Sequence, residues 1–275
     1  MRPILSFILL LFSMATSAQT IKIATYNLRY ANTTDIGNLW IERKHAVVDL
    51  IQYHQFDIFG VQEAVKLQLE DLKIALPSFD YYGVGRDDGQ SAGEHSSIFY
   101  KKERFTLLDK GDFWLSQTPE KPGFGWDAKF NRICSWVKLS DKRTKKIFFV
   151  FNAHYDHQGM VAREESSKLV LSKIQLIAGE SPVVFMGDLN GGRDTNWYLL
   201  LANSSSLKDT YDLVEKPYQL NGSFNGFNAN EVRKDVIDHI FVSKHFKADR
   251  WAVLTDTYFG KFPSDHFPVA VEINF

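Results

Sequence analysis

Residues 182–192, read as Pro-Val-Val-Phe-Met-Gly-Asp-Leu-Asn-Gly-Gly, constrain the fold of this chain more than any other segment. The apolar residues 183–186 predict a short buried strand, which stops at Gly187. Asp188 and Asn190 follow two residues apart, so at a strand end their side chains share a face and can point at one small target. An Asx turn that merely caps the strand explains the same pattern equally well. The choice between these two readings depends on the rest of the chain.

The composition indicates a folded globular protein. Its 275 residues fit one large domain or two small ones, and 44% hydrophobic with 24% charged residues is ordinary for a chain with a sizeable core. A net charge of −1 gives no support for tight, sequence-independent binding to nucleic acid, because proteins that bind in that way are usually basic. Cys134 is the only cysteine, which excludes an intrachain disulfide and a cysteine-based zinc site.

The first residues predict an export signal. Arg2 supplies a positive start, residues 4–14 are an apolar run too short to span a bilayer, and residues 16–18 are small enough for cleavage. We therefore expect residues 1–18 to be a signal peptide, residues 19–275 to form one domain, and the mature protein to be periplasmic or extracellular. A membrane anchor is the alternative, but no stop-transfer pattern follows the apolar run.

Hydrophobic periodicity predicts many strands with helices between only some of them. The expected strands are residues 21–27, 56–61, 97–100, 105–115 with a turn at Lys110-Gly111, 133–139, 147–152, 183–186, 236–242 and 268–273. The expected helices are residues 40–54, 67–76 and 163–178, and the long loops are residues 81–93, 118–131 and 221–230. This mixture predicts an α/β (α+β) domain with much antiparallel pairing rather than a pure succession of βαβ units.

Polar side chains mark the ends of these predicted strands, and one acid lies inside a strand. The strand-end residues are Asn27, Glu63, His154, Asp188, Asn190, Asp265 and His266, and the internal acid is Asp238. Carboxylates and amides without cysteine suit a hard cation such as Mg²⁺ or Mn²⁺, which can neutralise phosphate charge and help to generate hydroxide. A histidine can stabilise developing negative charge, and a carboxylate can accept a proton from water. If the strands share one sandwich, this set of residues is suited to phosphoester hydrolysis.

Six short motifs around these residues occur in the order found in the endonuclease/exonuclease/phosphatase superfamily, the DNase I-like group, which the chain resembles over nearly all of residues 19–275. The motifs are Thr25-Tyr26-Asn27, Val61-Gln62-Glu63, Asn152-Ala153-His154, Gly187-Asp188-Leu189-Asn190, Ile237-Asp238-His239-Ile240 and Ser264-Asp265-His266. The resemblance implies a four-layered α/β/β/α sandwich of two mixed sheets flanked by helices. Residues 152–159 with Arg163, and residues 125–127 leading to Arg132 and Trp136, are most similar to a secreted bacterial branch near the nocturnin-type deadenylases.

The resemblance also implies how a metal and a phosphate would be held. Glu63 would be the principal metal ligand, with Asn27 and Asp265 nearby. Asp188 would orient or deprotonate the attacking water, and Asn190 would hold the phosphate. The implied cofactor is Mg²⁺ or Mn²⁺, and the implied reaction is hydrolysis of a phosphomonoester or phosphodiester by in-line attack of water.

The remaining candidates concern the charge on the phosphoryl group. The resemblance implies that Asp238 hydrogen-bonds to His266 and that His266 and His154 face the phosphoryl oxygens. Arg132 follows the long loop of residues 118–131 and can clamp a phosphate, although an ordinary salt bridge accounts for it equally well. The partner is expected to be a phosphoester, either a small molecule or a nucleic-acid fragment, without a stable nucleic-acid complex.

Two other functions fit parts of the sequence. His154, Asp156 and His157 form half of the zinc motif of metallo-β-lactamase-like hydrolases, but Asn152 stands where that motif needs a further histidine. Asp156 and His157 can instead contact substrate, and simple surface polarity explains them equally well. A catalytically inactive binding domain on the same fold is the second alternative, which the complete set of polar residues argues against. The sequence leaves the identity of the substrate open.

Overall fold

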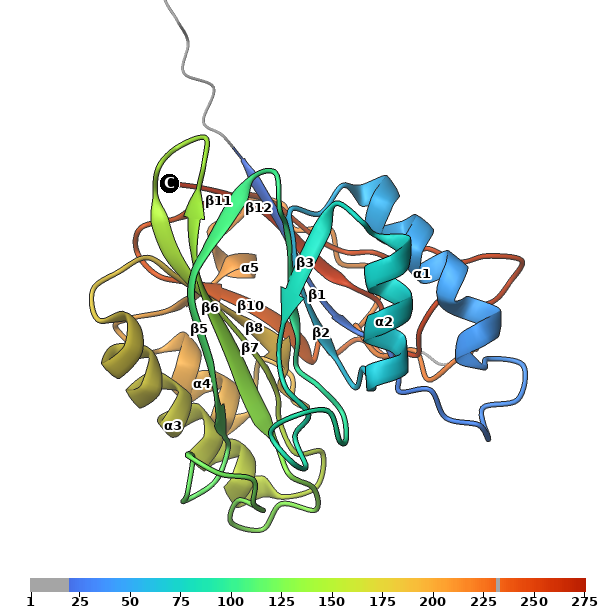
Figure 1. Cartoon of the computed structure of the whole chain (residues 1–275), viewed down its shortest axis with the longest axis horizontal. Helices are drawn as coiled ribbons and strands as arrows, with labels where there is room; N and C mark the ends of the chain where they lie inside the picture. Colours follow the sequence, from blue (N-terminus) through green and yellow to red (C-terminus); the bar gives the residue numbers. More distant parts are fainter. Residues whose placement is uncertain (1–19, 231–232) are drawn as a thin grey trace, which may run out of the picture.

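The computed structural model describes residues 20–230 and 233–275, which form two six-stranded mixed sheets packed face to face, with helices on the outer sides (Figure 1). The expected four-layered sandwich is therefore confirmed. The predicted signal peptide, residues 1–18, lies outside the described residues and stays a prediction. Within the described part of the chain, no helix is both long and apolar enough to cross a bilayer.

The first sheet has the strand order β11-β12-β1-β2-β4-β3. Its members are β1 (Ile21–Asn27), β2 (Ile58–Gln62), β3 (Phe79–Tyr82), β4 (Ile98–Lys101), β11 (Lys247–Val253) and β12 (Val269–Asn274). Only the pair β1 and β2 is parallel among the described strands of this sheet. Helices α1 (Trp40–His54) and α2 (Lys66–Ala75) cover one part of its outer face, where their apolar residues bury Ala24, Phe59 and Val61 of the sheet.

The second sheet has the order β5-β6-β7-β8-β10-β9. Its members are β5 (Phe105–Trp114), β6 (Ile133–Asp141), β7 (Ile147–His154), β8 (Val183–Asp188), β9 (Lys208–Asp209) and β10 (Asp238–Val242). The long helix α3 (Met160–Ala178) and the short helix α4 (Asn196–Ala202) pack on its outer face, and α5 (Thr210–Leu213) follows β9. The apolar faces of both sheets meet between the layers around Ile23, Val150 and Ile240.

The structure corrects the predicted turn at Lys110-Gly111. β5 continues through both residues, which pair with Val137 and Trp136 of β6. A Cβ atom on Gly111 would lie 2.8 Å from the ring of Trp136, so the glycine makes room for the indole within a continuous strand. The irregularity in β5 lies earlier, where the register shifts between Leu107 and Asp109.

Two parallel strand pairs end at the same edge of the sandwich. β1 and β2 pair so that Asn27 lies opposite Gln62, one residue before Glu63. β7 and β8 place His154 opposite Asp188. The antiparallel strand β10 begins here, with Asp238 opposite Asp188. Strand direction and register therefore bring polar residues from five strands to one edge.

A buried amide fixes the two sheets relative to each other just beneath this edge. Asn152 of β7 accepts a hydrogen bond from Gln62 Nε2 at 2.7 Å and donates to the carbonyls of Val61 at 2.9 Å and Ser97 at 3.0 Å. Gly60 permits this approach, since a Cβ there would lie 2.7 Å from the Asn152 amide. Buried polar groups that are fully paired in this way hold one specific arrangement of the layers.

At the opposite end of the sandwich, Arg104 links the two sheets through buried charges. Its guanidinium, 2% exposed, donates to Asp57 at 2.7 Å and to Asp141 at 3.2 Å. Replacing Arg104 with methionine is expected to lower the free energy of unfolding by about 3–5 kcal/mol, because the buried carboxylate of Asp141 loses its counter-charge, while Asp57 retains Lys101 at 3.0 Å. Urea denaturation measures this loss, and Lys102→Met, an exposed neighbour, should change stability by less than about 0.5 kcal/mol. A loss below about 1 kcal/mol for Arg104→Met would contradict the assignment.

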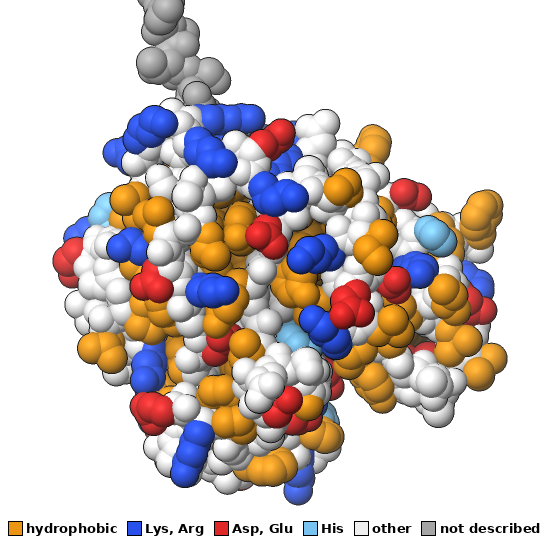
Figure 2. Space-filling view, in the orientation of Figure 1, with side chains coloured by type: hydrophobic (Ala, Val, Ile, Leu, Met, Phe, Trp, Pro, Cys, Tyr) orange, Lys and Arg blue, Asp and Glu red, His pale blue; other side chains and the backbone are white. Residues whose placement is uncertain are grey.

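The charged surface is mixed in sign, and a group of basic residues lies at the turn between β6 and β7. Figure 2 shows Lys and Arg side chains gathered toward this end of the molecule. The exposed basic residues of the turn are Lys142, Arg143, Lys145 and Lys146. Strand β7 runs its full length from this turn to His154, so the basic turn lies at the opposite end from the polar edge.

Candidate active site

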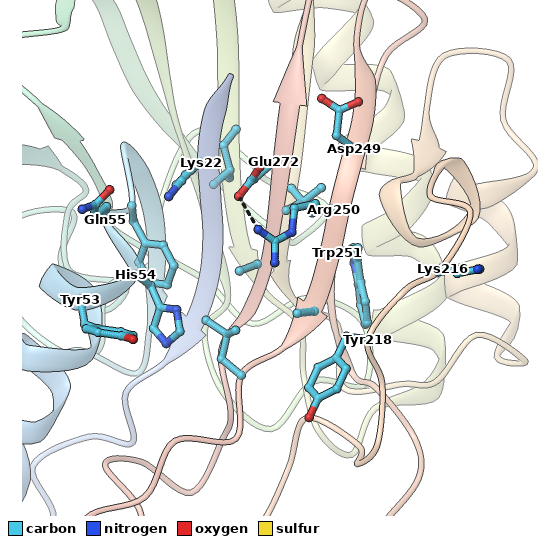
Figure 3. Close-up of a pocket in the computed structure, with 16 residues that line it drawn as sticks. Lys22, Tyr53, His54, Gln55, Lys216, Tyr218, Asp249, Arg250, Trp251 and Glu272 are labelled. Atoms are coloured by element: carbon cyan, nitrogen blue, oxygen red, sulfur yellow. Dashed lines mark ion pairs between the residues drawn. The ribbon is translucent and has the colours of Figure 1, made fainter. Parts of the chain in front are cut away.

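A large hollow on the surface does not contain the predicted residues, whereas a smaller hollow contains most of them. The large hollow has a volume of about 780 Å³ and lies over the outer face of the first sheet, beside the end of α1 (Figure 3). On its wall, Arg250 lies 3.8 Å from Glu272, and His54 contacts Asp256 at 3.1 Å. Its floor includes Ala252 and Ala270 of neighbouring strands. Size alone therefore does not identify the reactive site.

The smaller hollow, about 290 Å³, opens at the edge where the parallel strand pairs end. Its lining residues come from both sheets and their following loops: Arg29, Glu63, Arg132, His154, His157, Asp188, Asn190, Phe224, Arg233, Ile237, Asp265 and His266. Seven of the nine predicted site residues are among them. The other two, Asn27 and Asp238, are fully buried directly behind the lining and contact it. The structure thus brings all nine together, and we call this hollow the catalytic pocket.

Asp188 lies at the centre of the catalytic pocket. Its Oδ2 atom accepts a hydrogen bond from Asn27 Nδ2 at 3.0 Å, and its Oδ1 atom accepts one from the backbone N–H of Asn190 at 2.9 Å. Burial, together with the negative charge of Asp238, raises the pKa of Asp188 to about 7. A carboxylate in this range can accept and release a proton near neutral pH.

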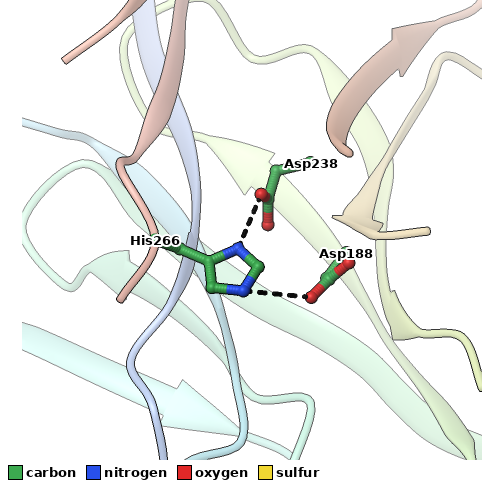
Figure 4. Close-up of side chains that lie close together, drawn as sticks. All are labelled: Asp188, Asp238 and His266. Atoms are coloured by element: carbon green, nitrogen blue, oxygen red, sulfur yellow. Dashed lines mark hydrogen bonds and ion pairs between the residues drawn. The ribbon is translucent and has the colours of Figure 1, made fainter. Parts of the chain in front are cut away.

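His266 stands between two carboxylates (Figure 4). Its Nδ1 atom donates to Asp238 Oδ2 at 2.9 Å, and its Nε2 atom lies 3.8 Å from Asp188 Oδ2. Burial alone would lower the pKa of His266, but Asp238 and the nearby Asp188 and Asp265 raise it to about 10. His266 is therefore an imidazolium whose Nε2–H faces Asp188. The predicted contact between Asp238 and His266 is confirmed.

His154 has the opposite charge state. Burial, together with the positive charges of Arg132 and Arg86, holds its pKa well below the ordinary value, so the ring is neutral. Arg132 Nη1 donates to Nδ1 at 3.0 Å, which leaves the ring proton on Nε2. That atom lies 3.6 Å from Asp188 and 3.1 Å from the amide of Asn190. Two histidines of different charge thus present Nε2–H groups on two sides of Asp188.

Arg132 combines the two features that the sequence left open, a salt bridge and a place at the predicted site. It pairs with Asp156 at 3.5 Å, and it also lines the catalytic pocket, where Nη2 contacts His157 Nδ1 at 3.2 Å. Asp156 accepts backbone N–H groups from the loop before Arg132 and from Gln158 and Gly159. It therefore joins two loops beside the pocket and orients Arg132. His157 lines the pocket, which favours the substrate-contact reading over simple surface polarity.

Asn27, Glu63 and Asp265 fit a divalent cation by their chemistry. Glu63 and Asp265 both line the pocket, and burial, with the added charge of Glu63, raises the pKa of Asp265 to about 6. Two carboxylates, with the Asn27 amide 3.1 Å from Glu63, offer the oxygen donors that Mg²⁺ or Mn²⁺ prefers. Turning the Asn27 amide by 180° would point its oxygen at the same space.

A second acidic cluster is less suited to a cation. Ligand atoms of Asp188, Asp238 and His266 lie within 4.8 Å of one another. However, His266 is positively charged and already donates to Asp238, so a cation there would have to displace a proton from a strongly bound imidazolium. A divalent cation therefore fits the space beside Glu63, Asn27 and Asp265 better than this cluster.

The backbone of the pocket is unusual at three positions. Arg29, Glu63 and Asn190 have φ angles of 52°, 60° and 48°, the left-handed region that non-glycine residues seldom occupy. Such conformations persist only where surrounding contacts fix them, and they cluster at functional sites. Glu63 immediately follows β2, and Arg29 and Asn190 stand two residues after β1 and β8, so the strand ends turn their side chains into the pocket.

Sequence reasoning assigned no site role to three lining residues. Arg29 pairs with Asp35 at 2.8 Å and reaches within 3.9 Å of Asp265. The ring of Phe224 meets the His266 ring edge-on at 5.0 Å, and the guanidinium of Arg233 lies 4.5 Å above the Phe224 ring. Arg29 stands two residues after Asn27, a spacing that signals a shared face, whereas no local signal distinguishes Phe224 or Arg233 from other loop residues.

Comparison with known proteins agrees with this geometry. Residues 24–266 match the model of the endonuclease/exonuclease/phosphatase family. A family protein from Bacteroides thetaiotaomicron is 46% identical and covers 93% of this chain and 98% of its own, with a TM-score of 0.91. A mannosyl-6-phosphatase from Bacteroides thetaiotaomicron VPI-5482 is 45% identical over 93% of this chain and 100% of its own, with a TM-score of 0.90.

A more distant similarity extends to the human nocturnin catalytic domain. It is 20% identical, covers 93% of both chains and superposes with a TM-score of 0.73, which shows the shared fold. Three findings point to one assignment. The chain has two sheets of the same architecture, the family match spans the polar edge from β1 to His266, and residues of the six predicted motifs gather at the pocket. The chain belongs to the endonuclease/exonuclease/phosphatase family, whose members hydrolyse phosphoester bonds and use divalent metal ions.

Proposed function

We propose that this protein is a divalent-metal-dependent phosphatase that hydrolyses small phosphomonoesters, with sugar phosphates as the first candidates. The observation that carries the proposal is the catalytic pocket itself, which gathers Asp188, Asn190 and both histidines in about 290 Å³. A pocket of this volume suits a phosphate with a small organic group. The 45% identity with a mannosyl-6-phosphatase supports a sugar as that group.

The charges in the pocket suit a phosphate monoester, which carries up to two negative charges. Arg29, Arg132 and Arg233 line it, and His266 adds a fourth positive charge. Glu63 and Asp265 on the same wall offset part of this charge, and a divalent cation bound there would restore a positive balance. The pocket therefore has the charge to bind a dianion and the chemistry to polarise it.

The residues of the chain can carry the reaction in one step. A water molecule next to Asp188 transfers a proton to its carboxylate while the water oxygen forms a bond to phosphorus and the bond from phosphorus to the leaving oxygen breaks. The Nε2–H groups of His154 and His266 donate to phosphoryl oxygens as negative charge develops. Asn190 donates its amide to the phosphate, and Arg132 holds it from the side of the long loop. A cation bound by Glu63, Asn27 and Asp265 supplies Lewis-acid polarisation of the phosphate.

The walls of the pocket favour a small substrate over a polymer. Phe224 and Ile237 lie on one side, and His157, stacked on Phe130 at 5.8 Å, lies on the other. The basic residues at the turn between β6 and β7 lie at the far end of the molecule, where they cannot guide a nucleic-acid backbone into the pocket (Figure 2). This arrangement supports a compact phosphoester as the substrate.

We also propose that the protein acts after export, in the periplasm or outside the cell. The support is the sequence of residues 1–18, with a basic start, an apolar run and small residues for cleavage. Comparing the mass of the protein secreted from its host with that of the full chain tests this proposal. Retention of residues 1–18 would contradict it.

A substrate panel tests the proposed activity. Mannose 6-phosphate, glucose 6-phosphate, nucleotides, bis-p-nitrophenyl phosphate, RNA and sphingomyelin should be assayed with Mg²⁺, with Mn²⁺ and after chelation. We expect phosphate release from sugar monoesters, loss of at least about 99% of the activity with chelator, and recovery on adding Mg²⁺ or Mn²⁺. Preferred cleavage of diesters would contradict the monoester assignment. No metal-dependent release from any substrate would favour a binding domain on the same fold.

A further inference from the structure

Three successive carbonyls behind the catalytic pocket are each held by a different side chain. They belong to Leu189, Asn190 and Gly191 in the segment that follows β8. We call Asp188–Gly191 the catalytic turn, because it carries both Asp188 and Asn190. The three donors come from separate elements, α3, α4 and β10, and none of them belongs to the proposed reacting groups.

Each contact has hydrogen-bond geometry. Trp197 of α4 donates its Nε1–H to the carbonyl of Leu189 at 3.0 Å. Arg163 of α3 donates Nη1–H to the carbonyl of Asn190 at 3.1 Å. His239 of β10 donates Nε2–H to the carbonyl of Gly191 at 2.9 Å. Trp197 and His239 are 7% and 1% exposed, so water cannot replace them readily.

The donors are themselves held in place. The guanidinium of Arg163 stacks on the Trp197 ring at 4.2 Å and also lies 3.4 Å from the carbonyl of His157. His239 Nδ1 faces Asp209 at 3.5 Å, which orients the ring so that Nε2–H points at the catalytic turn. This arrangement also gives a role to His239, which stands next to Asp238 on β10.

The catalytic turn needs such support because its backbone is strained. Asn190 is left-handed, with φ of 48°. Gly191 approaches Trp197 so closely that a Cβ atom would lie 2.3 Å from its Nε1 atom. Free in solution, this segment would sample other conformations, and the Asp188 and Asn190 side chains would leave their positions.

We propose that Trp197, Arg163 and His239 act together as positioning residues, which hold the catalytic turn by its carbonyls so that Asp188 and Asn190 stay aligned for attack on the phosphate. This inference rests on the proposed phosphatase activity. It assigns to the outer layer of the sandwich a role in the reaction, because α3 and α4 lie on the face of the sheet away from the first sheet. A displacement of about 1 Å at reacting groups can cost about a hundredfold in rate.

The first test is Trp197→Phe, which removes the indole N–H but keeps an aromatic ring beneath Arg163. We expect kcat on the best monoester of the panel to fall about tenfold or more. The matched control is Trp251→Phe: Trp251 is 3% exposed and its Nε1 atom has no hydrogen-bond partner among the described residues. Trp251 lies in β11 of the other sheet, so its replacement should leave kcat within about twofold even if Tm falls equally.

The second test uses His239, where a conservative variant can restore the contact. His239→Gln retains an N–H donor and should keep several-fold more activity than His239→Leu at comparable Tm. The double variant Trp197→Phe/His239→Leu should lose less than the product of the two single losses, because both act on one turn.

The outcomes separate the inference from the activity on which it rests. Wild-type protein inactive on the whole panel would overturn the proposed function. Wild-type activity together with kcat within twofold for Trp197→Phe, or equal activity of His239→Gln and His239→Leu, would overturn the positioning role alone. Equal losses of kcat for Trp197→Phe and Trp251→Phe would show that stability, not alignment, is responsible.

Discussion

Replacing Asp188 with asparagine is expected to lower kcat about a thousandfold while the protein stays folded. The carboxylate is the group next to which a water molecule can lose its proton, and an amide cannot accept that proton. Asparagine also presents only one oxygen to two donors, Asn27 Nδ2 at 3.0 Å and the N–H of Asn190 at 2.9 Å. The substrate and its contacts with Arg132 remain, so KM should change far less than kcat.

The stability of this variant distinguishes a chemical effect from a structural one. Burial and Asp238 disfavour the charged form of Asp188, so removing that charge should leave Tm unchanged or raise it by a few degrees. Asp194→Asn makes the same chemical change at an exposed position six residues further on and should retain wild-type kcat. Thermal denaturation and steady-state kinetics measure both quantities. Turnover within tenfold of wild type in purified Asp188→Asn would refute the role of the carboxylate.

His266→Ala should produce the second large effect, a fall in kcat of about a hundredfold to a thousandfold. The variant removes the imidazolium that would face the phosphoryl oxygens. It also removes the Nδ1–H that donates to Asp238 Oδ2 at 2.9 Å. Asp238 is fully buried, and its Oδ1 atom already has no hydrogen-bond partner among the described residues. We therefore expect Tm to fall as well, because a buried carboxylate becomes uncompensated.

A companion variant separates these two consequences. Asp238→Asn retains an oxygen that accepts from His266 but removes the charge that keeps the ring protonated, so kcat should fall about tenfold to a hundredfold with little unfolding. His45→Ala, an exposed histidine on α1, should behave like wild type in both assays. If His266→Ala is folded at the assay temperature and retains more than a tenth of wild-type kcat, the imidazolium has no important role in the reaction.

Strand prediction succeeded where a segment lies in the interior and failed at the margins. β1, β7 and β8 are buried over most of their length, so their apolar runs were visible in the sequence. The strand β11 at the sheet edge has exposed charged residues and was missed, as was β3 within a predicted loop. Edge strands depend on pairing with a distant partner, here β12, and carry little local hydrophobic signal.

The short helices α4 and α5 were missed for a related reason. Helix α4 has seven residues and α5 has four, too few for a helical period to stand out. α4 is nevertheless important, because it carries Trp197 to the carbonyl of Leu189. A single tryptophan in a short helix gives no indication of which backbone carbonyl it will meet.

The motifs at the strand ends predicted which residues gather, but not how each is charged. His154 and His266 are both buried histidines near the ends of strands, and the sequence predicted one common role for them. The structure separates them: Arg132 donates to one ring and keeps it neutral, while Asp238 accepts from the other and keeps it cationic. Charge states depend on neighbours contributed by remote segments, which a single sequence does not reveal.

The sequence by itself determined the layered α/β class, the family and the nine polar residues of the site, since strand periodicity and short motifs are local properties. It also placed Asp188 and Asn190 on one turn after a buried strand. Only the tertiary structure decided that Arg29, Phe224 and Arg233 complete the pocket, and that Trp197, Arg163 and His239 hold the catalytic turn from behind. These contacts join residues that are distant along the chain, so they arise from strand order and packing of the layers rather than from any local pattern.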